Sequence, residues 1–317
     1  MREKKPDNFP TSEPMNCDRT AVLITCHNRQ PETLACLAAL FNQILSTEVT
    51  IEVYLVDDGS TDGTREAVQQ TYPQVKILPG DGNLFWNGGM RKAFAEAIKQ
   101  DYDYYLWLND DTQLYSEALN TLLATSRQLA EQGKSCSIVV GSAQDPHNGI
   151  HTYGGVVQAH WWHPFHFRKL KPTETIQRCD TMNGNCVLIP RKVVQLVGNL
   201  DPTLSHYAAD YDYGLRARKQ GCTVWIAPGY TGTCARNPLP NRSLNTNQAW
   251  DKQLQKMSQP KGLPLKGATL ISVEEWKVFA QRHGGPLWLI YWLLPYRRLI
   301  TSWLFGKQKK DEVLGNS

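Results

Sequence analysis

The sequence lacks the spacings that mark structural zinc sites, although it contains eight cysteines. No cysteine forms a CxxC pair or stands in a CxxxH spacing, so a structural zinc site of these types is excluded. An apolar h-region is also lacking in residues 1–20, which are polar and contain prolines. We therefore expect no secretory signal, free thiols in a reducing compartment, and a cytoplasmic protein.

Clustered charge of one sign is lacking as well. The net charge is +4, and the Lys and Arg residues are scattered except near the ends, which is not typical of a nucleic-acid-binding protein. Hydrophobic residues make up 41% of the 317 residues, which is enough for a sizeable core. This size suits one large α/β domain with a tail or two small domains, and the composition excludes a disordered or fibrous protein.

Short segments rich in β-branched and aromatic residues predict buried strands in the first half of the chain. These segments are residues 21–26, 51–56, 75–78 and 104–108. Apolar residues at helical spacing predict helices at residues 31–43, 61–72, 89–100 and 116–128. The alternation of strand and helix predicts a mostly parallel central sheet with flanking helices and right-handed crossovers.

The second half of the chain has a less regular pattern. Strands are predicted at residues 137–141, 181–189 and 223–227, and a helix at 212–220. Residues 159–171 are rich in aromatics and histidine and are interpreted as a surface loop or lid, whereas residues 237–266 have the composition of a linker. We expect a disordered segment at 1–19, one domain at 20–236, and a linker with a C-terminal amphipathic helical tail at 237–317.

Polar motifs follow four of the predicted strands. In open α/β sheets, ligands bind outside the carboxyl ends of the strands, where the loops converge. The motifs are His27-Asn28-Arg29, Asp57-Asp58-Gly59-Ser60, Gly80-Asp81-Gly82-Asn83 and Asn109-Asp110-Asp111. The sequence therefore predicts a ligand site at this edge of the sheet.

The acidic motifs each have a plain structural interpretation beside the functional one. A turn followed by a helix N-cap accounts for Ser60 and Asp62, but it does not account for the adjacent Asp57 and Asp58, because buried charges destabilise a fold unless a partner binds them. A base or ribose with N–H or O–H donors would be such a partner. Asn109-Asp110-Asp111 fits either a turn before a helix or a metal site, since Mg²⁺ and Mn²⁺ prefer carboxylate oxygens and phosphates.

Glycines stand at the start of the third predicted helix. Gly88 and Gly89 allow backbone amides to approach an anion, and the N-terminus of a helix favours negative charge. A glycine pair by itself is a weak signal for a phosphate site. Its position after a strand strengthens that interpretation.

Six motifs taken together resemble one known family. In order, they are AVLITCHNR, VDDGSTDGT, GNLFWNGGMRKAF, LWLNDDT, DTMNGNCVLIPR and DYDYGLRARKQG. They resemble the family-2 inverting glycosyltransferases of the GT-A fold, and most closely the bacterial rhamnosyltransferase-like branch, over residues 20–236. The resemblance implies a Rossmann-like α/β fold and transfer of a sugar from a nucleotide-diphosphate donor to a hydroxyl of a glycan or lipid-linked acceptor, in cell-surface polysaccharide or glycoconjugate synthesis.

The resemblance also implies roles for individual residues. Asn109-Asp110-Asp111 corresponds to the DXD-type motif, with Asp111 as the ligand of Mg²⁺ or Mn²⁺. The implied donor-binding residues are Thr25, His27, Asn28, Asp57, Asp58, Asn83, Trp86, Asn87, Gly88, Asp110, Asn183 and Gly184.

Two positions depart from the family pattern. Ala209 replaces the first acid of the family's acidic pair, so Asp210 is implied as the sole general base, which must reach the acceptor hydroxyl. Asp212 is interpreted as the helix cap, although both acids could serve only as caps. Cys234 stands where many relatives carry a histidine. Because sulfur is a poor ligand for a hard cation, metal binding is expected either to depend on Asp111, phosphates and water or to be weak.

Two aromatic segments admit two interpretations each. Residues 161–166 contact the acceptor or pack as a plain loop. Residues 285–305 are interrupted by Pro295 and two arginines too early to span a bilayer. They fit a helix lying in the interface of the inner membrane or a helix packing on the core, and the first interpretation is favoured.

Two other functions remain open for the chain. A nucleotidyltransferase also uses a parallel sheet with acidic ligands, but it usually carries a Gly-rich loop after the first strand, which residues 27–31 lack. A nucleotide-sugar-binding protein without catalysis would explain Ala209 and the missing histidine.

Overall fold

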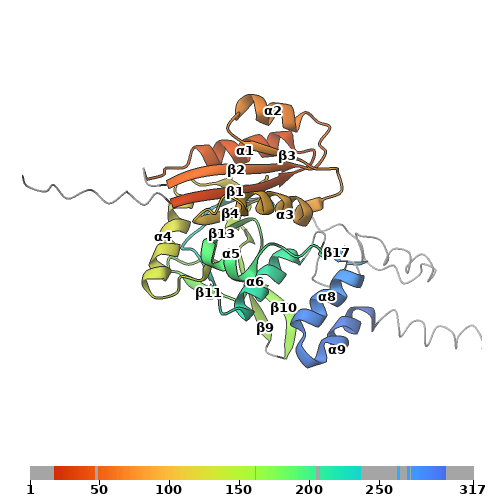
Figure 1. The fold of residues 1–317 in the computed structure, drawn as a ribbon. Coiled ribbons are helices and arrows are strands. Elements are labelled where there is room, and N and C mark those ends of the chain that lie inside the picture. Colours follow the sequence, from red (N-terminus) through yellow and green to blue (C-terminus); the bar gives the residue numbers. More distant parts are fainter. Residues whose placement is uncertain are drawn as a thin grey trace, which may run out of the picture.

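The computed structural model describes residues 18–46, 49–160, 162–204, 208–236, 263–264, 270–271 and 273–297. Its centre is an eight-stranded sheet (Figure 1). In spatial order the strands are β11 (Gln177–Cys179), β14 (Thr223–Ile226), β6 (Ser137–Val140), β13 (Cys186–Pro190), β4 (Tyr104–Leu108), β1 (Asp18–Cys26), β2 (Val49–Asp57) and β3 (Lys76–Pro79).

Parallel pairing dominates this sheet. Strands β4, β1, β2 and β3 run parallel to one another, as do β14 and β6. Strand β13 is antiparallel to both of its neighbours, and β11 is antiparallel to β14. The predicted α/β architecture with a mostly parallel sheet is confirmed, and the carboxyl ends of β4, β1, β2 and β3 lie at one edge.

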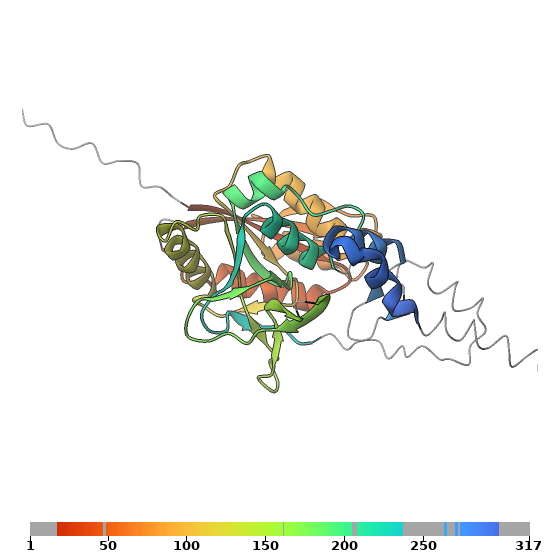
Figure 2. The ribbon, with the colours of Figure 1, turned by 90° about the horizontal axis from the view of Figure 1, so that it is seen from below.

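Helices cover both faces of the sheet, as Figure 2 shows. Helices α3 (Phe85–Ile98), α5 (Arg191–Val197) and α6 (Ala209–Lys219) pack on one face, where they bury alternate strand residues such as Leu23 and Trp107. Helices α1 (Gln30–Phe41), α2 (Thr64–Thr71) and α4 (Ala118–Glu131) pack on the other face against Val22 and Leu106. Both sides of the central strands are therefore buried, which explains their continuous apolar character.

Helix α3 begins four residues earlier than predicted, so its glycines lie inside the first turns rather than at the mouth of the helix. A Cβ atom at Gly89 would collide with the side chain of Thr25 on β1. This glycine lets α3 pack closely on the sheet. Helix packing alone thus explains why residue 89 is a glycine, and a bound phosphate is not needed to explain it.

Smaller sheets flank the central one. One contains β9 (Gly155–His160), β10 (His163–Lys169) and β12 (Thr181–Met182), and another contains β5 (Gln113–Leu114), β7 (Ala143–Gln144), β8 (His151–Tyr153) and β15 (Gly232–Thr233). A two-stranded sheet pairs β16 (Leu263–Pro264) with β17 (Leu270–Ile271).

Two predictions for the second half are corrected. The segment 159–171 is mainly a strand rather than a loop, because β10 pairs antiparallel with β9 and packs Phe165 and Phe167 against the C-terminal helices. The strand predicted at 181–189 is divided into β12 and β13. The three residues between them, Asn183, Gly184 and Asn185, form part of the candidate site described below.

The C-terminal helices dock on the domain (Figure 1). Helix α8 (Val273–His283) is followed by a 3₁₀ turn (Gly285–Leu287), α9 (Trp288–Leu293) and a second 3₁₀ turn (Leu294–Tyr296). Trp276 and Phe279 of α8 pack with Leu215 of α6. No helix within the described residues is long and apolar enough to cross a membrane. Most of the predicted linker, and the tail beyond residue 297, lie outside the described residues.

Candidate active site

The four strand-end motifs are joined by hydrogen bonds, so the predicted convergence is confirmed. His27 Nδ1 donates to the Asp58 carbonyl at 2.6 Å, and Thr61 N donates to Asn28 Oδ1 at 2.7 Å. Trp86 Nε1 donates to Asn109 Oδ1 at 2.8 Å. Gly82 N of the third motif donates to Asp58 of the second, and Arg29 of the first donates to Asp110 of the fourth, so all four motifs are connected.

Asp57 and Asp58 are both buried, each with 4% of its surface exposed. The partners of their carboxylates include backbone amides of the protein itself. Asp57 Oδ1 accepts from Ser60 N at 3.1 Å, while Asp58 accepts from Gly82 N at 2.9 Å and from Phe85 N at 3.1 Å. Hydrogen bonds from these amides offset part of the cost of burying the two carboxylates, and a base or ribose, the partner proposed from the sequence, would add to them.

Arg29 bridges the two carboxylates of the fourth motif. Its guanidinium donates to Asp110 Oδ1 at 3.2 Å and to Asp111 Oδ2 at 2.9 Å. The sequence interpretation assigned Arg29 no role, although it is the only permanent cation in the four strand-end motifs. A buried acidic pair needs a cation, and this signal was available in the sequence.

The second oxygens of Asp110 and Asp111 have different surroundings. Asp110 Oδ2 is buried without a hydrogen-bond partner, and burial raises the pKa of Asp110 to about 7. Asp111 Oδ1 accepts from the Cys234 thiol at 3.3 Å. Cys234 is 2% exposed, and burial raises the pKa of its thiol far above neutrality. The thiol therefore stays protonated, which makes it a donor to Asp111 rather than an anionic metal ligand.

Asp210 lies in the first turn of α6, beside the loop between β12 and β13. Its Oδ2 accepts from Gly184 N at 3.0 Å and its Oδ1 from Tyr211 N at 2.8 Å. Burial raises the pKa of this carboxyl to about 6. A carboxylate with this pKa is mostly ionised at neutral pH but accepts a proton readily, as a general base must.

Gly184 connects Asp210 to the strand-end motifs. A Cβ atom at this position would lie 2.5 Å from Trp86 Cζ2 and 3.3 Å from Asp210 Cβ. The indole of Trp86 and the side chain of Asp210 therefore both lie close to the same backbone segment. Because Trp86 also donates to Asn109, the candidate base and the acidic motif share one continuous set of contacts.

Asp212 is not the helix cap that the sequence predicted. The N-cap position is Ala208, which has a left-handed φ of 65° and makes no side-chain cap. The Asp212 carboxylate is fully buried and pairs with Arg216, Arg282 and His283. Because the helix starts at Ala209, Asp212 is the fourth residue of the helix rather than its cap, and its side chain faces α8.

The other implied donor residues divide into accessible and buried positions. His27, Asn28 and Asn83 are exposed, and Thr25 and Trp86 are half-buried. Asn183 Oδ1 is buried without a partner. Asn87 is 1% exposed, and its amide donates to the carbonyls of Asp201 and Leu204. Asn87 thus anchors the loop around residue 201, and Gly88 packs against Leu84.

The metal-binding capacity of the site rests on few groups. Within the residues that the structure describes, no cluster of three or more His, Cys, Asp or Glu side chains could hold a metal ion. The partnerless oxygen of Asp110, next to Asp111, still fits the protein's share of a Mg²⁺ or Mn²⁺ site in which phosphates supply further ligands.

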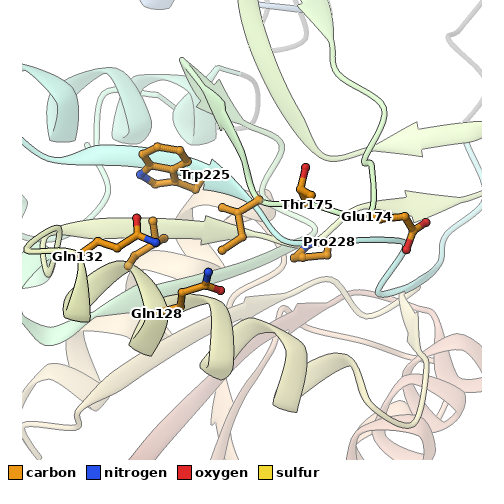
Figure 3. Close-up of a pocket in the computed structure, with 8 residues that line it drawn as sticks. Gln128, Gln132, Glu174, Thr175, Trp225 and Pro228 are labelled. Atoms are coloured by element: carbon orange, nitrogen blue, oxygen red, sulfur yellow. The ribbon is translucent and has the colours of Figure 1, made fainter.

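A separate hollow lies at the other end of the sheet order, between α4, β14 and the segment preceding β11 (Figure 3). Of the eight residues that line it, only Glu174 ionises. Its lining includes Gln128, Trp225 and Pro228, and it shares no residue with the strand-end site. Nothing in its chemistry competes with that site as a reaction centre.

The fold is an α/β fold with buried acidic side chains at the carboxyl ends of parallel strands. The family model "Glycosyl transferase family 2" matches residues 21–196, more than half of the chain. The chain therefore belongs to glycosyl transferase family 2. Membership decides against the nucleotidyltransferase alternative.

Curated relatives agree with this family. An N-acetylglucosaminyl-diphospho-decaprenol L-rhamnosyltransferase of Mycobacterium tuberculosis is 27% identical over 204 residues, which cover 58% of this chain and 65% of that protein. The chain thus matches just under two thirds of that relative's length. Galactofuranosyltransferase GlfT2 of Mycolicibacterium smegmatis is 28% identical over 237 residues, which cover 66% of this chain and 36% of that protein. The predicted rhamnosyltransferase-like branch is confirmed.

Two solved structures have weak similarity to this chain. The mannosyltransferase PcManGT from Pyrobaculum calidifontis, in complex with GDP-Man and Mn²⁺, has a TM-score of 0.49 and 15% identity, with 90% of this chain and 71% of that chain covered. S. aureus TarS has a TM-score of 0.48 and 15% identity, with 68% and 60% covered.

Proposed function

We propose that this glycosyltransferase moves a sugar from a nucleotide-diphosphate donor to a hydroxyl of a lipid-linked or glycan acceptor with inversion, using Asp210 as general base. One observation carries the proposal. Gly184 contacts Trp86 and Asp210, and Trp86 binds Asn109 of the acidic motif. A base and a diphosphate-binding motif must stand on either side of the reacting sugar carbon for in-line displacement.

The donor binds at the carboxyl ends of β1, β2 and β4. His27 and Asn28 are exposed at the end of β1, and Trp86 offers a half-buried aromatic face to the ribose or sugar. Asp57 and Asp58 shape the loop through their amide bonds and keep its backbone in place. Arg29 neutralises the two acids while no cation is bound to them.

Asp110 and Asp111 are the residues that would hold a divalent cation. When bound, Mg²⁺ or Mn²⁺ supplies positive charge that stabilises the leaving diphosphate. A mannosyltransferase of the same fold class is known in complex with GDP-Man and Mn²⁺. Cys234 orients Asp111 through its thiol instead of binding the cation itself.

The acceptor approaches from the side of α6 and the β9–β10 hairpin. The mycobacterial rhamnosyltransferase is named for a lipid-linked diphosphate acceptor. Trp162 at the hairpin tip is 57% exposed, and Leu287, Leu289, Ile290 and Leu293 around α9 are also exposed. Tyr291 Oη donates to the Trp162 carbonyl at 2.6 Å, so these side chains belong to one end of the molecule. This apolar end contacts the cytoplasmic face of the inner membrane, and the sequence that follows it contains Lys307, Lys309 and Lys310.

Substitution of the base tests the proposal. Asp210→Asn removes the proton acceptor at nearly constant shape, so the variant is expected to bind donor normally and to lose transfer by at least 100-fold. A thermal-shift screen of UDP-, dTDP- and GDP-sugars with and without Mn²⁺ identifies the donor first. Glu131→Gln, at the exposed end of α4, is the matched acid-to-amide control. Retained turnover in Asp210→Asn would show that Asp210 is not the base.

A further inference from the structure

A buried ionic cluster joins the C-terminal helix α8 to helix α6. Asp212 Oδ1 accepts from Arg282 at 2.6 Å and from His283 Nε2 at 2.8 Å, and Asp212 Oδ2 accepts from Arg216 Nε at 2.7 Å. The Asp212 carboxylate has no exposed surface, and the His283 side chain is 4% exposed. Removal of one partner from such a cluster destabilises the fold, since the remaining charges stay buried without compensation.

The cluster also reaches the loop that supports helix α3. Arg282 pairs with Asp201 at 2.5 Å, and the Asp201 carbonyl accepts from Asn87 of α3 at 2.7 Å. Arg216 donates to the carbonyls of Val197 and Asn199. Helix α6 is therefore connected to two neighbouring segments as well as to α8.

Aromatic packing surrounds these polar contacts. Phe165 of β10 lies 4.9 Å from Trp276 and 5.4 Å from Phe279, measured between ring centroids. Leu215 of α6 is buried in the same cluster. Both views show α8 beside α6 (Figures 1 and 2). Helix α8 thus forms part of the surroundings of α6, although its sequence lies outside the region matched by the family model.

We propose that Arg282 and His283 are positioning residues for Asp210, acting through Asp212 on the first turn of α6. Asp212 is two residues from Asp210, and its backbone N–H closes that turn by donating to the Ala208 carbonyl at 2.8 Å. The inference rests on the proposed role of Asp210 as base. Neither Arg282 nor His283 touches the Asp210 carboxylate, whose own partners are the amides of Gly184 and Tyr211.

The position of the helix therefore decides where the Asp210 carboxylate stands. A displacement of about 1 Å in a reacting group lowers the rate by about 100-fold. Most of the proposed donor contacts lie on other elements, at the ends of β1, β2 and β4, so a shift of α6 changes them less than it changes Asp210. Loss of the α8 contacts is thus expected to lower kcat much more than it changes the donor affinity.

The experiment uses the full chain with three substitutions in α8. Arg282→Ala removes both ion pairs, Arg282→Lys retains the charge, and His283→Gln retains a hydrogen-bond donor of similar size. Gln281→Ala, at the exposed neighbouring position, controls for changes in the helix itself. Val68→Ala, in the core on the opposite face of the sheet, controls for a general loss of stability.

The measurements are kcat, the KM for the donor, the dissociation constant of the donor nucleotide, and the pH dependence of kcat. Arg282→Ala is expected to lower kcat at least tenfold with donor affinity within twofold of wild type, and Arg282→Lys to recover part of the loss. The acidic limb of the pH profile is expected to move, because the surroundings of Asp210 change. Gln281→Ala and Val68→Ala should keep the wild-type kcat and pH profile.

Two results would overturn the inference. One is a kcat within twofold of wild type in both Arg282→Ala and His283→Gln. The other is a loss of kcat no larger than in Val68→Ala at equal melting temperature. If Arg282→Ala does not fold, Arg282→Lys and His283→Gln carry the same comparison. Asp210→Asn is measured in parallel: full transfer by that variant would refute the proposed base, whereas its inactivity beside near-wild-type kcat in both Arg282→Ala and His283→Gln would refute only the positioning role.

Discussion

The substitution Asp212→Asn tests the energetic role of the buried cluster. The amide keeps the shape of the side chain but removes the negative charge that faces Arg216, Arg282 and His283. Lys219 and Asp201 are the other charged groups that act on the cluster. Asp212 is fully buried, so water does not replace the lost interactions.

The magnitude follows from the pKa of the Asp212 carboxyl. Hydrogen bonds from His283 and the charges of the two arginines outweigh burial and lower this pKa from 3.8 to about 2. A depressed carboxyl pKa adds stability above the unfolded-state value, and this stability is lost as the pH falls through the folded-state value. The difference corresponds to about 2 to 3 kcal/mol in the free energy of unfolding at neutral pH.

Urea denaturation of both proteins between pH 7 and pH 2.5 measures this contribution. Asp212→Asn is expected to be less stable by about 2 to 3 kcal/mol at pH 7, and the gap should close between about pH 4 and pH 2 as Asp212 becomes protonated in the wild type. Glu274→Gln, an exposed acid on α8, is the control and should change little. A gap below about 0.5 kcal/mol at pH 7, or a gap that does not depend on pH, would refute the reasoning.

Three further predictions concern single contacts. In Gly184→Ala the new methyl group would meet Trp86 and Asp210, so kcat should fall at least tenfold while circular dichroism shows an unchanged fold; an unchanged kcat would contradict the contact. Burial lowers the pKa of His283 below 6.5, so this group binds protons more readily in the unfolded chain, and the wild type should lose stability relative to His283→Gln from pH 7 to pH 5. A stability difference between the two proteins that does not change over that interval would count against the prediction. In Arg29→Ala, Asp110 and Asp111 lose their shared cation, so added Mn²⁺ should raise the melting temperature more than in wild type; an equal or smaller rise would show that the carboxylates do not bind the ion.

The sequence patterns located most of the central sheet because its strands are buried on both faces. Tyr104–Leu108 was predicted to the residue, and β1 and β2 were predicted within three residues at each end. The predicted loop at 159–171 was wrong. In β10 the side chains of Phe165 and Phe167 pack against residues of distant helices, and the local sequence pattern contains no information about those contacts. The cap role of Asp212 failed for the same reason, since its partners Arg282 and His283 lie 70 and 71 residues away in the sequence.

Taken by itself, the chain determined the order of strands and helices and the placement of polar motifs at four strand ends. These features depend on hydrophobic period and on turn residues, which are local properties. The tertiary structure decided which charges face each other. It showed that Arg29 binds both acids of Asn109-Asp110-Asp111 and that Cys234 donates to Asp111. It also placed α8 against α6. Such pairings join residues that are far apart in the sequence, and only burial in a common fold brings them within hydrogen-bonding distance.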